Sequence, residues 1–179
     1  MKRQVINSAE DLHLLEQQIL RSVDATSASL KELLNGETPL AAFARLKFTE
    51  AGHDPLNVSR PLNFIEQLNQ TFTYLASVEA ARWLLTHHPA CAPLVLSLGT
   101  LSGFDIQSEC GQFVAETFAV THPGSNDKLR KDVAKMQTTV AAHRFVFYIS
   151  PSTAGPFQAS GVTIVQLRHP AIDALNSDA

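Results

Sequence analysis

Residues 103–120 read GFDIQSECGQFVAETFAV, and this stretch has the pattern of two short strands joined by a turn. Turn-forming residues at 108–111 separate two segments that carry aromatic and β-branched side chains. If Cys110-Gly111 forms a two-residue turn, Asp105 lies directly opposite Glu116. Side chains in such a cross-strand pair share one face of the hairpin, with Cβ atoms about 5 Å apart. A one-residue slip in register would instead send one acid to the other face.

Two carboxylates at that distance repel each other, and a shared proton or a cation must relieve the repulsion. Mg²⁺ is a suitable cation, because it is held by one or two carboxylates together with water and phosphate oxygens. Glu116 is the only charged residue in 113–120, and its neighbours on the same face are Val114 and Phe118. An acid on such an apolar face usually has a partner or a function. The alternative is a structural salt bridge, to Arg144 or to Lys128.

The segment that begins at Pro61 and runs to about His87 has the apolar spacing of a long helix. Glu66 is the only charged residue between Pro61 and Ser77. A row of polar side chains at helical spacing indicates a helix that is buried on most sides, with this row against another element or a site. The row consists of Asn63, Gln67, Gln70, Tyr74 and Ser77. A structural network of buried amides is the competing interpretation.

Basic residues gather after the hairpin, where residues 126–144 have a formal net charge of +3 inside an acidic protein. At helical spacing Lys128, Asp132 and Lys135 share one face of a short helix predicted from Asp127 to Met136. Such a helix could neutralise the phosphates of a DNA partner, bound through the segment from Lys128 to Arg144. A solvated helix without a ligand is the alternative.

The remaining pattern predicts one domain, residues 1–179, with a mixed β-sheet flanked by helices. We expect a helical extension over residues 1–60 and an α/β core over residues 61–170. Apolar helical spacing begins after Ser8, and small polar residues at 24–29 are expected to break this first helix. A short helix is expected from Pro39 to about Leu46 and a turn at 52–55. The expected strands are 95–98, 103–107, 112–120, 144–149 and 162–167.

Composition places further limits on function. The formal net charge is −3, so a nucleic-acid partner would require a local basic patch. No apolar segment is long enough to span a bilayer, the basic start is not followed by an apolar signal-peptide region, and the two cysteines lack metal-site spacing. We therefore expect a cytoplasmic protein with no membrane partner, and the sequence leaves a homodimer open. It contains no P-loop, no Gly-x-Ser-x-Gly elbow and no His-Glu-x-x-His motif.

An acid in one strand and an acid in the next, with helices before and after, resembles the PD-(D/E)XK core of restriction-endonuclease-like nucleases. The resemblance covers about residues 61–167 and implies a restriction-endonuclease-like fold in which Asp105 and Glu116 bind a divalent metal, Mg²⁺ or Mn²⁺. It also implies a catalytic role for Glu66 as the acid of the preceding helix. Phe118 stands where the family has its catalytic lysine. Some members are thought to supply this amine from the following helix, where Lys128 is the first candidate and Lys131 the second.

Three functions follow, in order of preference. The first is a metal-dependent DNA endonuclease, a phosphodiesterase in which Asp105 and Glu116 hold the metal and Lys128 polarises the water or the phosphate. The second is a catalytically inactive nuclease fold that acts as a binding or assembly module, which Phe118 and the net acidity favour. The third is a small-molecule-binding or protein-binding α/β domain whose acids are merely paired.

Overall fold

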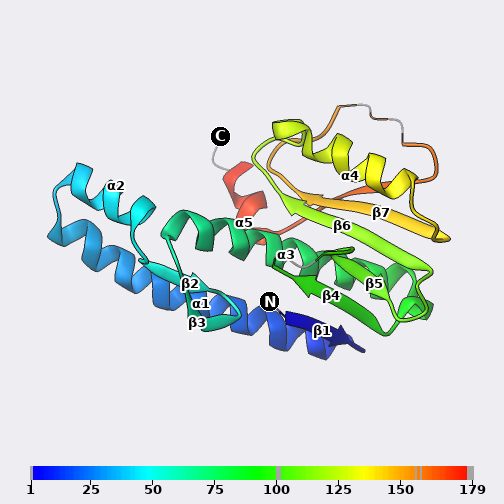
Figure 1. Ribbon diagram of the computed structural model, residues 1–179, viewed down its shortest axis with the longest axis horizontal. Coiled ribbons are helices and arrows are strands. Elements are labelled where there is room, and N and C mark those ends of the chain that lie inside the picture. The colour runs from blue at the N-terminus through cyan, green and yellow to red at the C-terminus, as the bar shows by residue number, and fades with distance from the viewer. Residues whose placement is uncertain (1, 100–101, 156, 158, 177–179) are drawn as a thin grey trace. The chain divides into compact units, whose positions relative to one another are not determined.

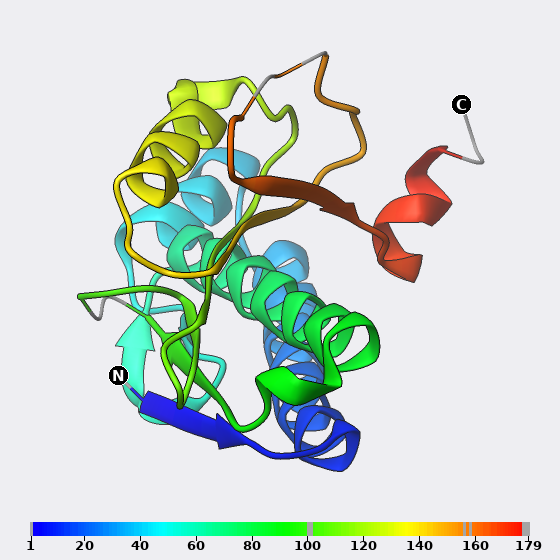
Figure 2. The same ribbon diagram turned by 90° about the vertical axis from the view of Figure 1, so that its right-hand side faces the viewer.

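Six strands pair into one sheet in the computed structural model, which describes residues 2–99, 102–155, 157 and 159–176 (Figure 1). The segments 113–119, 143–149 and 163–167 are rich in the β-branched and aromatic residues that favour strands. The strand order is β1-β4-β5-β6-β7-β8, and Figure 2 shows β1 and β8 at the two edges. The sheet is mixed: β1 to β6 pair antiparallel and β6 to β8 pair parallel. The strands are β1 (Lys2–Ile6), β4 (Leu94–Leu98), β5 (Ile106–Ser108), β6 (Phe113–Ala119), β7 (His143–Ile149) and β8 (Thr163–Leu167).

Contacts divide the chain into two compact units. The sheet unit comprises residues 1–12 and 76–179, and the helical unit comprises residues 13–75. The boundaries fall inside helices α1 (Ala9–Gly36) and α3 (Phe64–His87), so neither coincides with the predicted border at residue 60. In the described part of the chain, no helix combines the length and the apolarity needed to cross a membrane.

The hairpin of β5 and β6 has the predicted register. Ile106 pairs with Ala115 and Gln107 with Val114, and the same register carried one residue further brings Asp105 opposite Glu116. The strands end at Ser108 and resume at Phe113, so the connection is wider than the predicted two-residue turn. Within it the Gly111 N–H donates to the Ser108 carbonyl, 2.9 Å away, and Gly111 has a φ of +71°, a conformation that glycine adopts without a steric penalty.

Helix α4 (Lys128–Gln137) provides the crossover between the parallel strands β6 and β7, and it packs on both of them (Figure 1). Its apolar stripe and the even-numbered residues of the two strands form one buried cluster. This cluster contains Leu129, Val133 and Met136 of α4 together with Val114, Phe118, Val146 and Tyr148 of the sheet. Side chains alternate across a strand, so Glu116 belongs to the same face as Val114 and Phe118.

The second half of α3 covers the opposite face of this sheet. The Trp83 ring packs edge-on against Phe145 and Phe147, with centroids 5.8 and 5.4 Å away. One polar bond joins the same layers, because Ser77 Oγ lies 2.7 Å from Thr117 Oγ1. The hydroxyl pair is buried, so the bond satisfies groups that water cannot reach. Helix α5 (Pro170–Asp173) follows β8.

The helical unit contains most of α1, helix α2 (Pro39–Phe48), a small sheet and the start of α3. The small sheet pairs β2 (Gly52–Asp54) with β3 (Asn57–Leu62). The short helix predicted from Pro39 is confirmed as α2. The predicted break of the first helix at residues 24–29 is wrong, since α1 continues through it. Thr26 Oγ1 accepts a bond from Gln67 Nε2 at 2.6 Å, so this small polar residue has a partner inside the helix packing.

Two further expectations differ at strand positions. The basic start of the chain is strand β1, which pairs with β4 and is therefore not part of a helical extension. Lysine and arginine are common on edge strands, where they oppose pairing with other chains. The residues expected to form a turn at 52–54 form β2, and Pro61 lies in β3 rather than at the start of a helix. Proline is tolerated there because a two-stranded sheet consists of edges.

Candidate functional site

Glu116 is a buried acid on the α4 face of the sheet, with 5% of its surface exposed. Val114 and Phe118, its neighbours on this face, are buried as well. The placement follows from the alternation of β6, where one charge replaces an apolar residue in a row that α4 covers. The predicted apolar surroundings of Glu116 are therefore confirmed. A carboxylate in such a place requires a partner.

The partner comes from the far end of α4. Lys135 Nζ lies 2.6 Å from Glu116 Oε1 and also donates to the Gly103 carbonyl at 2.6 Å. The same ammonium stands over the Phe104 ring, 5.3 Å from its centroid. Lys135 thus ties α4 to β6 and to the loop before β5. The expected salt bridge of Glu116 exists, but Lys135 forms it and neither Arg144 nor Lys128 does.

Asp105 directly precedes β5, where the strand pairing with β6 ends. Its Oδ2 accepts the backbone N–H of Thr117 at 2.7 Å and lies 3.4 Å from the Thr117 hydroxyl. The backbone carbonyl of Asp105 accepts the N–H of Ser97 in β4 at 2.8 Å. The Asp105 side chain therefore accepts a hydrogen bond from a strand N–H. This bond orients the carboxylate, whose charge acts on Glu116.

A second ion pair lies on the same stripe of α4. Lys128 Nζ donates to Asp132 Oδ1 at 2.8 Å and stands over the Phe118 ring, 5.8 Å from its centroid. Asp132 is 5% exposed. Its other oxygen, Oδ2, is buried and has no hydrogen-bond partner among the described residues. A buried acceptor in this state is uncommon in folded proteins and calls for an explanation.

We call the three acids and two lysines, Asp105, Glu116, Asp132, Lys128 and Lys135, the acid cluster. Its charges act on one another. Burial raises the pKa of Glu116 to about 7, and Asp105 adds to the rise while Lys135 opposes it. Burial also raises the pKa of Asp105, against the Thr117 N–H and the two lysines. Burial raises the pKa of Asp132 as well, Lys128 opposes this, and Asp105 adds to it.

The donor set of the acid cluster fits a hard divalent cation. Its three acids supply only carboxylate oxygens, which Mg²⁺ and Mn²⁺ prefer, and the unpartnered Oδ2 of Asp132 is free to accept. Two ammonium groups would compete with a cation for these acids, because Lys128 pairs with Asp132 and Lys135 pairs with Glu116. Among the described residues, the three carboxylates do not offer three oxygens within 4.8 Å of one another. A cation would therefore have to draw them together and displace an ammonium group.

The other predicted site residues take different positions. Lys128 lies in the acid cluster but on Asp132, and Lys131 Nζ donates to the Asn126 carbonyl at 3.1 Å. Glu66 is exposed in the first turn of α3 and belongs to the helical unit. Its N–H donates to Asn63 Oδ1 at 2.9 Å, as at a helix N-cap. The catalytic role of Glu66 therefore stays a prediction.

Sequence reasoning did not identify Lys135 as the partner of Glu116, nor Asp132 as a buried acid. The signal for both was present, because spacings of four and three residues put Lys128, Asp132 and Lys135 on one stripe beside the apolar stripe of α4. The spacing does not say which lysine reaches β6. That depends on how far α4 extends along the sheet.

The polar row of α3 supports the structural interpretation. Gln67 Nε2 donates to Ser22 Oγ at 3.3 Å and to Thr26 Oγ1 at 2.6 Å. Its Oε1 accepts the N–H of His53 at 3.0 Å. Tyr74 donates its hydroxyl to Asp54 Oδ2 at 3.2 Å. These groups satisfy one another, so this part of the row requires no ligand.

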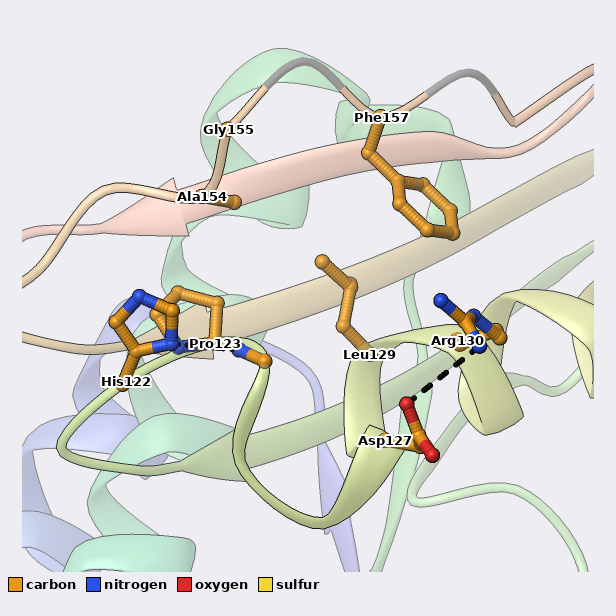
Figure 3. A pocket seen from close by; sticks show the side chains of 9 residues that line it. His122, Pro123, Asp127, Leu129, Arg130, Ala154, Gly155 and Phe157 are labelled. Atoms are coloured by element: carbon orange, nitrogen blue, oxygen red, sulfur yellow. Dashed lines mark hydrogen bonds and ion pairs between the residues drawn. The ribbon is translucent and has the colours of Figure 1, made fainter.

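A separate pocket of about 200 Å³ lies at the opposite end of α4 from Lys135 (Figure 3). Figure 3 shows Leu129 and Phe157 on its walls. Its polar groups pair locally: Arg130 lies 3.6 Å from Asp127, and the Gly124 N–H donates to the His122 ring at 3.1 Å. No residue of the acid cluster lines this pocket. The acid cluster, with its unbalanced charges, is the stronger candidate for function.

Comparison of the chain with models of known protein families finds no match, and comparisons with curated proteins and with solved structures find none either.

Proposed function

We propose that the protein is a metal-dependent phosphodiesterase that cleaves DNA, with its active centre at the acid cluster. The observation that carries the proposal is the meeting of a buried acid, a neighbouring acid and an amine. Glu116 is paired with Lys135 at 2.6 Å, and Asp105 acts on the same carboxylate. A second acid beside a buried carboxylate raises its pKa, and such like-charge pairs are a feature of functional sites.

The order of elements agrees with the proposal. Helix α3 precedes strands β4 to β8, while β1 of the same sheet comes before it. Asp105 directly precedes β5, Glu116 lies on the neighbouring strand β6, and α4 follows. This is the arrangement that the resemblance to PD-(D/E)XK nucleases implies. Phe118 occupies the lysine position of that motif, and Lys135 supplies an ammonium to Glu116 from the following helix. We therefore assign the role of the missing lysine to Lys135 in place of Lys128.

In the proposed reaction a water oxygen forms a bond to phosphorus and one P–O ester bond breaks. The leaving alkoxide takes one proton of the water, and the other remains on the new phosphate or passes to solvent. Asp105 and Glu116 would hold a divalent cation, which when bound activates water and stabilises charge on the phosphate. Thr117 would keep Asp105 oriented through its N–H. Lys135 would hold the water or a phosphate oxygen beside Glu116 and offset the developing negative charge.

The proposed DNA partner would bind beside α4, through the basic residues between Lys128 and Arg144. Much of this charge is committed locally, because Lys128 and Lys135 pair with acids. Arg144 points back to the carbonyls of Gln137 and Thr139, at 3.4 and 3.5 Å. We therefore expect DNA binding to be weak, salt-dependent and strengthened by a divalent cation, since such a cation would release ammonium groups from the acids.

A cytoplasmic location belongs to the same proposal. Both cysteines, Cys91 and Cys110, are free thiols in the structure, and free thiols suit a reducing compartment. A homodimer remains a further possibility within the proposal, and sedimentation equilibrium on the purified protein decides it.

A second candidate function is a nuclease-like module without catalysis, used for binding or assembly. The specific observation in its favour is the Lys135–Glu116 pair, which places an ammonium where a metal would bind. The bond between Asp105 and the Thr117 N–H also occupies one oxygen of the other acid. In this candidate the acid cluster holds α4 on the sheet and binds nothing.

A DNA cleavage assay tests the proposal. Supercoiled and linear DNA are incubated with the protein in Mg²⁺, in Mn²⁺ and in chelator. The comparison includes Asp105→Asn, Glu116→Gln and Lys135→Met. Lys31→Met is the matched control, because this lysine is exposed on α1 and lies outside both the acid cluster and the basic segment 126–144. We expect cation-dependent cleavage by the wild type and by Lys31→Met, and a loss of at least 100-fold in the other three.

Cleavage that persists in chelator, or that is unchanged in both Asp105→Asn and Glu116→Gln, would contradict the proposed active centre. Absence of cleavage under every condition would favour the non-catalytic module. Thermal unfolding in chelator is measured for each variant, so that a loss of fold is not mistaken for a loss of catalysis.

A further inference from the structure

Asp132 carries a feature that the proposed reaction does not use. It lies on α4 between Lys128, four residues before it, and Lys135, three residues after it. One of its oxygens bonds to Lys128 Nζ at 2.8 Å. The other, Oδ2, is buried without a hydrogen-bond partner in the described part of the chain. The residue is buried by more than nine-tenths, so bulk water does not compensate this oxygen.

The charges around Asp132 are out of balance. Lys128 and Lys135 come from α4, and their charges act on the Asp132 carboxylate, as does that of Asp105 from the residue before β5. The charge of Asp132 in turn acts on Glu116 of β6. Three carboxylates therefore face two ammonium groups. Lys135 is committed to Glu116 and Lys128 to one oxygen of Asp132. The unpartnered oxygen, Oδ2 of Asp132, is therefore the position at which an additional positive charge would be most stabilising.

A proton on Asp132 would not remove the problem, because a protonated acid requires an acceptor for its O–H. A divalent cation would remove it, since it accepts lone pairs from several carboxylates at once. Such a cation would also compensate Asp105 and Glu116, which repel each other. The same oxygen-donor chemistry thus accounts for all three acids.

We propose that Asp132 is a third carboxylate ligand of the divalent cation at the acid cluster, and that it binds through its unpartnered oxygen Oδ2. The inference rests on the proposed function, which assigns the other two ligands. It adds a specific competition: the Lys128 ammonium on Oδ1 repels a cation on Oδ2, so the cation binds at the expense of the ion pair between Lys128 and Asp132. Lys128 is thereby a placeholder for the cation and not the catalytic amine.

Two substitutions separate ligation from a structural role, because they should change cation affinity in opposite directions. Asp132→Asn removes a ligand and should weaken Mn²⁺ binding at least tenfold. Lys128→Met removes the competing ammonium and leaves the carboxylate, so Mn²⁺ should bind several-fold more tightly than to the wild type. Asp127→Asn is the control: this exposed acid precedes α4 and pairs only loosely with Arg130, at 3.6 Å, and its loss should leave the affinity unchanged.

The measurement is titration calorimetry of Mn²⁺ on the full chain, with the manganese electron paramagnetic resonance signal as a second readout. Neither depends on DNA cleavage. Unfolding temperatures in chelator show whether each variant is folded. If Asp132→Asn does not fold, Lys128→Met alone decides: tighter binding than in the wild type supports the proposal, and weaker or equal binding overturns it.

The outcomes distinguish this inference from the proposed function. Mn²⁺ binding by the wild type that Asp132→Asn retains in full would overturn the role of Asp132 and leave Asp105 and Glu116 as ligands. Equal weakening by Asp132→Asn and Lys128→Met would show that Asp132 acts only by holding Lys128, which also overturns the inference. No Mn²⁺ binding by the wild type up to millimolar concentration, with or without DNA, would remove both proposals.

Discussion

Two groups of buried polar residues differ in how completely their members satisfy one another. In the helical unit Asp54 is 3% exposed, and donors reach both of its oxygens. Oδ1 accepts the Leu56 N–H at 2.9 Å, and Oδ2 accepts from Arg60 at 3.1 Å and from Tyr74 at 3.2 Å. In the acid cluster, Asp132 is buried to a similar degree, but one of its oxygens has no hydrogen-bond partner among the residues that the structure describes.

Buried charges with a structural role and buried charges with a functional role differ in how fully their polar atoms are paired. A satisfied network such as that of Asp54 stabilises one conformation and leaves no group for a ligand. The acid cluster has more acids than ammonium groups, and burial raises the pKa of Glu116 to about 7. A protein keeps such an imbalance at a cost in stability, and sites of chemistry are where this cost is commonly found.

The largest expected loss of stability comes from the hydrogen-bonded network around Asp54. Asp54→Ala leaves the Arg60 guanidinium, the Tyr74 hydroxyl and the Leu56 N–H without their acceptor. We expect the free energy of unfolding to fall by about 3 kcal/mol in urea denaturation at pH 7. Asp24→Ala, at an exposed position of α1, is the control and should change it by less than about 0.5 kcal/mol. A loss as small as the control's would mean that Asp54 is not a structural anchor.

The pH dependence of stability tests the acid cluster. The pKa of Glu116 rises from its ordinary 4.5 to about 7 on folding, so the folded chain binds a proton in this range more readily than the unfolded chain. The contribution of protonated Glu116 to the free energy of unfolding is therefore complete below about pH 4.5 and is lost as the pH rises through 7. Burial raises the pKa of Asp105 and of Asp132, so these two acids also make the folded chain less stable as the pH rises.

We expect the free energy of unfolding to decrease by about 2 kcal/mol between pH 5 and pH 8, with a smaller decrease in Glu116→Gln. Urea denaturation across this range, without divalent cations, measures both slopes. The difference between the two proteins isolates the contribution of Glu116 from that of every other titratable group. Parallel slopes would mean that Glu116 ionises as easily in the folded chain as in the unfolded one.

Gln67 tests the satisfied network at its amide. Gln67→Met removes one acceptor and two donors, so the His53 N–H and the hydroxyls of Ser22 and Thr26 lose buried partners. The free energy of unfolding should fall by about 2 kcal/mol. Gln18→Met, on the exposed side of α1, serves as the control. An equal and small change in both variants would indicate that the network contributes little.

The smallest expected effect concerns the bond between α3 and β6. Thr117→Val removes the hydroxyl that lies 2.7 Å from Ser77 Oγ but keeps the N–H that holds Asp105. We expect a loss of about 1 kcal/mol in unfolding free energy and an unchanged Mn²⁺ affinity. Ser77→Ala and the double variant complete a cycle that measures the coupling of the two hydroxyls. A clear drop in Mn²⁺ affinity would show that the hydroxyl also positions Asp105.

The hairpin was largely predictable from residues 103–120. The turn segment and the alternation of β6 were enough to bring Asp105 opposite Glu116 and to put Glu116 on an apolar face. The strands 95–98, 144–149 and 162–167 were also predicted close to β4, β7 and β8, because their β-branched and aromatic residues are local signals. The restriction-endonuclease-like fold remains a proposal.

The errors lie where partners distant in sequence override local signals. A basic start such as Lys2-Arg3-Gln4 does not indicate a strand, and β1 exists because β4 offers it an edge to pair with. Small polar residues at 24–29 suggested a break, yet Thr26 is helical and bonded to Gln67. In both cases tertiary contact supplied stabilisation that the local sequence lacks.

By itself the sequence determined the hairpin register, the apolar surroundings of Glu116 and the stripe of Lys128, Asp132 and Lys135, because strand alternation and helical spacing are local properties. Only the tertiary structure decided that Lys135 pairs with Glu116 and Lys128 with Asp132, and that Oδ2 of Asp132 has no hydrogen-bond partner within the described part of the chain. These pairings depend on how α4 lies along the sheet. That position is set by the packing of its apolar stripe and not by the charges it carries.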